Sequence, residues 1–427
     1  MRMVKVDFTE VETKSPRPRR LTREKGFNNL FISTSAAAFG GSVSTVAVSW
    51  IVYFYTHSAV YIAYLGLAGI IPGIVLGLLA GVIADRYDRK TLMVTSDVVR
   101  TVSMAILALF LYLVSFSFPL ILAIMVVVYT FSTIFQPASQ AILPMLVQRE
   151  GLENANGMLQ GSFSVFQAIG SAAGGLVVAY LGAVWGLGIN SMTYAVSAIF
   201  LFMIVGHFKS RPTDGSVNQS SFSSELRVGM SYMKQHLPVL EVTLGSLPVN
   251  FFGSLIGPFL VIYASVKFGS NSASYGYLVA ALAGGMALGS LLVGRIKASR
   301  YAGLMIAIGF LVTGGTVSIL ALTTNLYIAL VIGIATGLII GLINTTYVST
   351  MQSIVPVELL ARVLSIDSVG SFAAIPAGLA LGGILIPAYG IVFTYLVAGI
   401  GLLANGLIVL SMKGFRSLKY VPADPEK

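Results

Sequence analysis

Twelve long apolar segments dominate this 427-residue sequence. A helix rises about 1.5 Å per residue and needs roughly 20 mostly apolar residues to cross the hydrocarbon layer of a membrane. Each segment is long enough, and each is bounded by charged residues, Pro, Gly or Asn. We therefore predict an all-α polytopic membrane protein with twelve transmembrane helices, which span residues 28–56, 61–83, 92–114, 118–142, 157–181, 184–207, 238–266, 273–294, 302–323, 326–353, 362–386 and 390–412.

Composition argues against several other classes of protein. The chain is 56% hydrophobic and only 10% charged, a balance that an ordinary soluble core does not require. It has no Cys, which excludes disulfides and thiolate metal sites. Its three histidines, His57, His207 and His236, stand far apart at span ends, unlike the convergent ligands of a metal or catalytic centre. We expect no metal, no cofactor and no enzymatic activity, and no repeated filter motif indicates a channel.

The positions of Lys and Arg predict how the chain is oriented. Of these 26 residues, 25 fall on one side of the predicted spans, and only Lys267 falls on the other. Because positive loops remain in the cytoplasm, we expect both termini to be cytoplasmic and the protein to lie in the cell membrane. The basic first 26 residues then serve as a topology signal or touch anionic lipid, and we expect no nucleic acid as partner.

Glycines reveal an internal repeat at an offset of 208 residues, and a repeat with six spans per copy predicts two parallel six-helix bundles. Seven glycines of the first copy recur in the second: Gly77/Gly285, Gly81/Gly289, Gly170/Gly378, Gly174/Gly382, Gly175/Gly383, Gly182/Gly390 and Gly206/Gly414. Four GxxxG steps result, which allow close helix packing. We expect these steps to hold each bundle together, although they could also form a sliding interface between the bundles.

The repeat and the charge pattern together predict five regions. Between the bundles, a polar Ser-rich stretch leads into the amphipathic segment FSSELRVGMSYMKQ, which we expect to form a short helix at the membrane surface. The regions are a basic tail (1–26), a first bundle (27–207), a cytoplasmic linker with that helix (208–236), a second bundle (237–413) and a cytoplasmic tail (414–427).

The stretch GVIADRYDRK lies between the second and third predicted spans and resembles a motif of the major facilitator superfamily, roughly G-x-x-x-D-R-x-G-R-R/K. The matching residues include Gly81, Asp85, Arg86, Arg89 and Lys90. The DRYDRK form, FQPASQAILPMLV and Asn-Ala-Asn at 154–156 are similar to an exporter branch that includes macrolide-efflux and enterobactin-export proteins.

This resemblance implies a secondary transporter that works by alternating access as a monomer in the lipid bilayer. It favours proton-coupled efflux of small amphipathic compounds. Transport of a lysophospholipid or a metabolite by the same fold is the alternative. Many proton-driven antiporters of the superfamily carry an Arg in the fourth helix, which this chain lacks there, so the driving ion remains open.

The resemblance also implies a conformational latch. In the family, the Asp of this motif lies near the start of helix 11 when the transporter is open to the outside, so Asp85 could pair there with Arg362. Gly81, Arg86, Arg89 and Lys90 belong to the same motif. Alternatively, the charges of the motif are a solvated topology signal.

Four charged residues are candidates for proton transfer or ion pairing. Asp97 and Arg100 lie three residues apart on one helix face and could simply neutralise each other. Asp367 could pair with an Arg of the motif or carry a proton. Glu241, one turn into the seventh span, could carry a proton or extend to the membrane interface.

Family geometry implies a central cavity between helices 1, 4, 7 and 10, with contributions from helices 2, 5, 8 and 11. Its candidate lining residues bear amides, hydroxyls and rings, and they show no cationic cluster, which favours an amphipathic or weakly charged substrate. Each could instead join helix to helix. They are Ser42, Thr45, Tyr129, Gln136, Gln167, Asn250, Phe251, Asn344 and Tyr347.

Overall fold

The computed structural model describes residues 25–148, 151–206, 208, 222–269, 271–293, 301–416 and 418, and this part of the chain contains helices and no strand. The first six helices are α1 (Lys25–Thr56), α2 (Ala59–Arg86), α3 (Arg89–Leu113), α4 (Phe118–Leu146), α5 (Leu152–Tyr180) and α6 (Ala183–Phe202). They are followed by α7 (Phe222–Gln235), α8 (Leu237–Gly253), α9 (Leu260–Phe268), α10 (Ser272–Val293), α11 (Ala302–Leu322), α12 (Leu326–Ile354), α13 (Val357–Ser411) and α14 (Lys413–Arg416).

Ten of these helices are long and apolar enough to cross a membrane, and α13 accounts for two of the predicted spans. Gly390 interrupts α13 with a φ of 84°, a left-handed conformation that Gly adopts without a steric cost, so the chain reverses between two spans there. The seventh predicted span is wrong as one continuous helix, because α8 and α9 are separated at residues 254–259. Pro258 lies in this break and has no backbone N–H to continue a helix.

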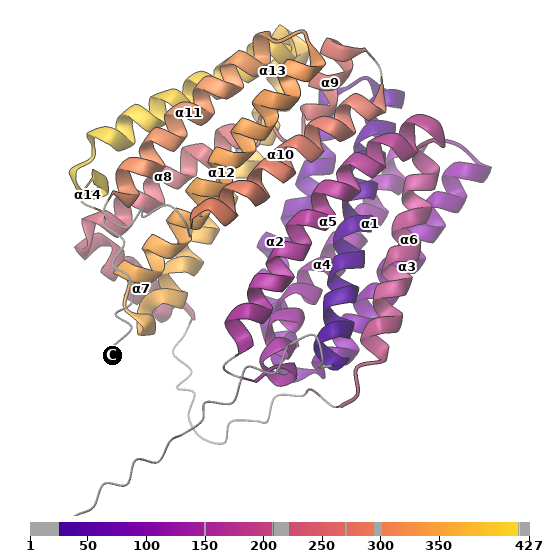
Figure 1. The fold of residues 1–427 in the computed structure, drawn as a ribbon, viewed down its shortest axis with the longest axis horizontal. Coiled ribbons are helices and arrows are strands. Elements are labelled where there is room, and N and C mark those ends of the chain that lie inside the picture. Colours follow the sequence, from indigo (N-terminus) through magenta and orange to yellow (C-terminus); the bar gives the residue numbers. More distant parts are fainter. Residues whose placement is uncertain are drawn as a thin grey trace, which may run out of the picture.

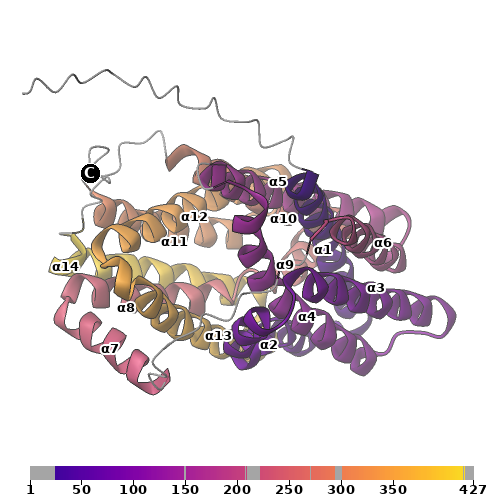
Figure 2. The ribbon, with the colours of Figure 1, turned by 90° about the horizontal axis from the view of Figure 1, so that it is seen from below.

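The helices form two groups, which we call the first half (α1–α6) and the second half (α8–α13), and Figure 1 shows them diverging like a V. Within the first half, α1 packs on α5 and α6, and α3 packs on α4 and α6. Within the second half, α10 packs on α12, and α11 packs on α13. Seen from below, α2 and α5 of the first half and α10 and α13 of the second lie at the boundary between the halves (Figure 2). The two halves touch mainly through α5 with α10 and α2 with α13.

Buried apolar side chains show on which side the halves are joined. We call the side where α1 begins and α14 ends the terminal side. One apolar cluster contains residues of both halves near the far ends of α1 and α8–α9, among them Val52, Ile62, Phe259 and Tyr263. On the terminal side the clusters are separate: one belongs to the first half and includes Phe27, and another belongs to the second half and includes Phe415. The halves are therefore packed together on the far side and apart on the terminal side.

The GxxxG steps that the structure describes pack within the halves, as predicted. A Cβ on Gly170 or Gly174 would meet the backbone of α1, and one on Gly285 would meet the backbone of α12. The contact between halves uses the next glycine of the repeat. At this point Gly175 of α5 lies against Gly276 of α10, so close that the absence of a side chain on either helix permits the contact.

Candidate functional site

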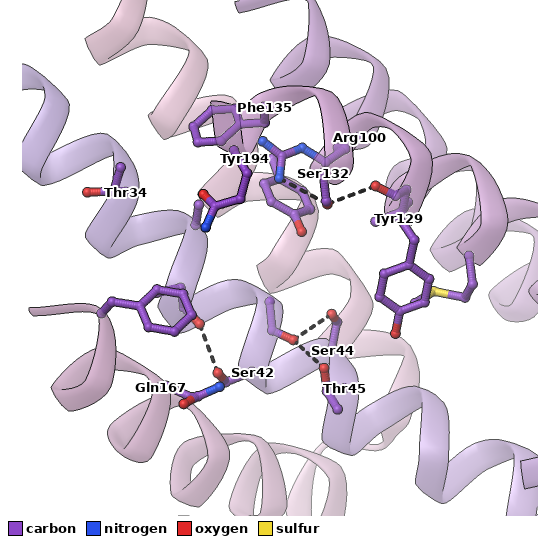
Figure 3. Close-up of a pocket in the computed structure, with 17 residues that line it drawn as sticks. Thr34, Ser42, Ser44, Thr45, Arg100, Tyr129, Ser132, Phe135, Gln167 and Tyr194 are labelled. Atoms are coloured by element: carbon purple, nitrogen blue, oxygen red, sulfur yellow. Dashed lines mark hydrogen bonds between the residues drawn. The ribbon is translucent and has the colours of Figure 1, made fainter. Parts of the chain in front are cut away.

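The first half contains a cavity of about 270 Å³, which we call the first cavity (Figure 3). Five predicted lining residues surround it: Ser42, Thr45, Tyr129, Gln136 and Gln167. Ten of its 17 lining residues are polar or carry a hydroxyl, namely these five together with Thr34, Ser44, Arg100, Ser132 and Tyr194. The long helices α1 and α4 supply most of these residues, and α3, α5 and α6 supply the rest.

The second half contains a cavity of about 370 Å³, which we call the second cavity. Two further predicted residues, Asn250 and Asn344, line it. Most of its other lining residues are aliphatic, including Ile256, Val279 and Ile340. The second cavity is thus larger and less polar than the first.

The two cavities occupy equivalent places in the repeat. Eight lining residues of the first cavity map onto lining residues of the second when 208 is added to their numbers. The pairs are Gly41/Val249, Ser42/Asn250, Thr45/Gly253, Val128/Thr336, Ser132/Ile340, Phe135/Ile343, Gln136/Asn344 and Tyr194/Leu402. The offset that aligns the glycines therefore also aligns the two cavities.

Two predicted lining residues do not line either cavity. Phe251 packs edge to face on Phe252, with ring centres 5.1 Å apart, and its carbonyl accepts a hydrogen bond from Ser254 Oγ at 2.7 Å. Tyr347 lies instead beside Asp367. In this conformation these contacts of Phe251 lie at the end of its own helix, and Tyr347 contacts α13.

Three charged side chains are buried among the described residues, and two of them are Asp97 and Arg100. They form an ion pair on α3, as their spacing of three residues allows. Asp97 also accepts a hydrogen bond from Ser197 of α6, whose hydroxyl lies 2.8 Å from Ser33 Oγ of α1. The pair thus connects three helices.

Arg100 also faces the first cavity, which the sequence did not reveal. Its guanidinium carbon lies 4.6 Å from the ring centre of Phe135 and 4.4 Å from that of Tyr194, so two aromatic rings hold it by cation–π contacts (Figure 3). Its Nη1 donates a hydrogen bond to Ser132 Oγ at 3.3 Å. These neighbours lie on α4 and α6, so no local signal near Arg100 in the sequence indicated the contact.

Asp367 is the third buried charge and has a different environment. Ser246 Oγ donates to its Oδ1 at 3.5 Å and lies 2.9 Å from Ser371 Oγ. The hydroxyls of Thr243 and Tyr347 are buried beside the carboxylate, and neither forms a hydrogen bond of good geometry here. Within the described part of the chain, no Lys or Arg forms an ion pair with Asp367.

Glu241 has a structural partner. Its Oε2 accepts the backbone N–H of Phe415 at 2.6 Å, which fastens the segment after the last span to the beginning of α8. Asp88, at the start of α3, makes a similar contact in the first half, because its Oδ2 accepts the backbone N–H of Phe208 at 2.6 Å. Asp88 also caps α3, since its Oδ1 accepts the N–H of Thr91 at 2.9 Å.

Two further residues of the DRYDRK stretch, Arg89 and Lys90, also pack within the first half. Arg89 Nη1 donates to the carbonyl oxygen of Ala141 at 3.1 Å, and Lys90 Nζ lies 5.1 Å from the ring centre of Phe202. The contacts of the remaining latch candidates are not described: the surroundings of Gly81 and the side chains of Asp85, Arg86 and Arg362 lie outside the described part of the structure.

Comparison with known proteins adds a family to this geometry. Residues 20–423 match the model of a family described as transmembrane secretion effector. The chain is 26% identical over 403 residues to the multidrug efflux pump Tap of Mycolicibacterium fortuitum, covering 91% of this chain and 96% of that protein. It is 27% identical over 402 residues to the uncharacterized MFS-type transporter YfiS of Bacillus subtilis, covering 91% and 93%.

Solved structures show the same fold at low sequence identity. A nucleoside transporter, NupG, superposes with a TM-score of 0.72 at 13% identity, covering 91% of this chain and all of that one. A bacterial homologue of the human lysosomal transporter Spinster, in an inward-facing and unoccupied conformation, superposes with a TM-score of 0.69 at 15% identity, covering 95% and 100%. These matches show an all-α polytopic membrane fold.

Proposed function

Because the chain belongs to the transmembrane secretion effector family of major facilitator transporters, we propose that it exports small amphipathic compounds across the cell membrane by proton-coupled alternating access. The observation on which this proposal mainly rests is that the halves share an apolar core on one side only. Two bodies that are packed at one end and apart at the other can expose a central site to one side of the membrane at a time. The named multidrug efflux relatives support export.

We assign the terminal side to the cytoplasm, because 25 of the 26 Lys and Arg fall on the same side of the predicted spans as the two termini, and the positive-inside rule places that side in the cytoplasm. The structure then corresponds to the state that is open to the cytoplasm. In the opposite state, we propose that Asp85 meets the beginning of α13 near Arg362 and biases the balance between the two states. Gly81, which has no side chain, would allow the close approach, and Arg86 would support the contact.

We propose Asp367 as the carboxylate that binds and releases the coupling proton. The hydroxyls of Ser246, Ser371, Thr243 and Tyr347 face it from α8, α12 and α13, and they can hydrogen-bond with either its neutral or its charged form. Of the four residues that face Asp367, only Tyr347 has a side chain that can itself titrate. Asp97 is a poorer candidate, because Arg100 already neutralises it.

Transport in inside-out vesicles with an imposed pH gradient tests this proposal, with ethidium and a lipophilic fluorescent dye as probes. We expect the wild type to concentrate a probe, and Asp367→Asn to equilibrate it without concentrating it, because the amide cannot exchange a proton. Glu241→Gln is the matched control, since this carboxylate lies in the same half and binds a backbone amide. Asp367→Asn that still concentrates the probe with unchanged pH dependence would exclude Asp367 as the coupling group.

A further inference from the structure

The two cavities have equivalent positions and different chemistry, and we infer that they bind opposite ends of one substrate. The first cavity binds an end rich in hydrogen-bond acceptors, and the second binds an aliphatic body. The substrate class is an uncharged or weakly charged amphipath with carbonyl, ether or sulfonyl oxygens at one end. This inference rests on the proposed function, because it describes the site that such a transporter would use.

The repeat isolates the chemical difference between the cavities. At three of the eight equivalent positions, the first cavity has a side chain that can interact with a polar or charged group, and the second cavity has a purely aliphatic one. These pairs are Ser132/Ile340, Phe135/Ile343 and Tyr194/Leu402. The first-cavity residue of each pair, Ser132, Phe135 or Tyr194, contacts the guanidinium of Arg100. The second cavity thus lacks the serine and both rings that hold an arginine in the first, and none of its lining residues is charged.

Arg100 adds charged donors to the amides and hydroxyls of the first cavity. Its Nε donates to the carbonyl oxygen of Ser96, one η nitrogen donates to Ser132, and the other donates to Asp97. An arginine has five N–H groups, so two have no partner among the described residues and can donate to a bound molecule. Because the fully buried Asp97 compensates the charge, the cavity favours neutral acceptor oxygens over multiply charged anions.

The second cavity offers room and apolar contact. Its lining includes Ile256, Val279, Val317 and Leu402. Burial of an alkyl or cycloalkyl body among such side chains is favourable in proportion to the apolar area removed from water. Asn250 and Asn344 are its amides, and Asn344 stands at the position equivalent to Gln136 of the first cavity.

This equivalence provides a matched pair of variants, Gln136→Leu and Asn344→Leu. Both remove an amide, both sites are exposed to open space, and both lie on the corresponding helix of their half. The probes are dansyl-octylamide, whose sulfonyl oxygens accept hydrogen bonds, and the same dimethylaminonaphthalene with the sulfonamide replaced by methylene groups. Binding is measured by fluorescence in lipid nanodiscs, with empty nanodiscs as the reference and thermal unfolding as the check on folding.

We expect the wild type to bind dansyl-octylamide more tightly than the hydrocarbon probe. Loss of one donor in Gln136→Leu should weaken binding of dansyl-octylamide roughly fivefold and leave the hydrocarbon probe unaffected. Asn344→Leu should change the affinity of both probes by the same small factor. Ile340→Ser, which removes apolar contact in the second cavity, should weaken both probes equally.

Three results would overturn the assignment: no preference of the wild type, loss of the preference in Asn344→Leu rather than Gln136→Leu, or unchanged binding of both probes in Ile340→Ser. Binding with the expected pattern but without transport in vesicles would contradict efflux and leave the assignment of the cavities standing. Transport without discrimination between the probes would contradict the assignment alone.

Discussion

The first half buries a complete ion pair, whereas the second half buries a carboxylate that no described Lys or Arg neutralises. In the first half, Asp97 and Arg100 satisfy each other and tie α3 to α6 and α1 through two serines. In the second half, Asp367 lies among hydroxyls that can act as donors or acceptors. If Asp367 carries the coupling proton, as proposed, charge is a fixed structural element in the first half and a variable one in the second.

The cavities show the same contrast. Arg100 and two rings give the first cavity directional donors, while aliphatic side chains give the second an adaptable apolar surface. Under the proposed function, a repeat that keeps the positions and changes the side chains would divide the tasks of a transporter: polar recognition in the first half, and apolar binding with proton exchange in the second.

The largest contrast should appear in stability. Asp97→Asn leaves the buried guanidinium of Arg100 without a counter-charge, so we expect it to lower the free energy of unfolding by about 3–5 kcal/mol. Asp367→Asn leaves no buried charge unpaired among the described residues, and its amide can still hydrogen-bond, so we expect a loss below about 1 kcal/mol. Denaturant titrations of both variants in detergent measure the difference.

A double variant separates loss of the pair from loss of contacts. Asp97→Asn combined with Arg100→Gln removes both charges and should recover more than half of the stability lost in Asp97→Asn. Equal losses in Asp97→Asn and Asp367→Asn would show that the two carboxylates have the same role, and the comparison between the halves would then fail.

Much of this fold follows from local sequence. The predicted span 302–323 differs by one residue from α11 (Ala302–Leu322), because charged and turn-forming residues bound the apolar run. The ion pair of Asp97 and Arg100 was also predictable, since a spacing of three residues places both on one helix face. In both cases the residues that decide the outcome are neighbours in the chain.

The remainder depends on contacts between distant helices. Nothing near Arg100 in the sequence indicates that Phe135 and Tyr194 hold its guanidinium, since they lie on α4 and α6. The break between α8 and α9 did have a local indicator, Pro258, but a long apolar run concealed it. The capping role of Asp88 likewise had a local indicator, since Asp is a preferred N-cap residue, but the resemblance to a charged motif obscured it.

A second contrast concerns the adjacent glycines Gly174 and Gly175. A Cβ on Gly175 would lie 2.7 Å from Gly276 Cα in the other half, whereas a Cβ on Gly174 would lie 3.0 Å from Val43 Cα in its own half. We expect Gly175→Ala to disfavour the joined far side by about 1–3 kcal/mol, which shifts the protein toward the opposite state. Gly174→Ala should lower stability without changing access.

Access is measured by labelling a single Cys introduced at Ser42, which lines the first cavity, with an impermeant maleimide from each side of the membrane. The chain has no Cys of its own, so the label reports one position. Gly383→Ala controls for substitution at the boundary between halves, because its Cβ would lie 3.5 Å from Ala63 Cβ, an ordinary contact. Equal labelling of Gly174→Ala and Gly175→Ala would contradict this assignment of the two glycines.

The smallest contrast lies between the tethers Asp88 and Glu241, which bind the backbone N–H groups of Phe208 and Phe415. Asp88 also caps α3, so we expect Asp88→Ala to cost about 1–2 kcal/mol and Glu241→Ala about 1 kcal/mol. Hydrogen exchange should accelerate at Phe208 in the first variant and at Phe415 in the second, because each amide loses its acceptor. Faster exchange spread over whole helices would mean that these carboxylates stabilise their halves generally. Faster exchange confined to the two segments would show that each half anchors its own end independently, as bodies that move relative to each other require.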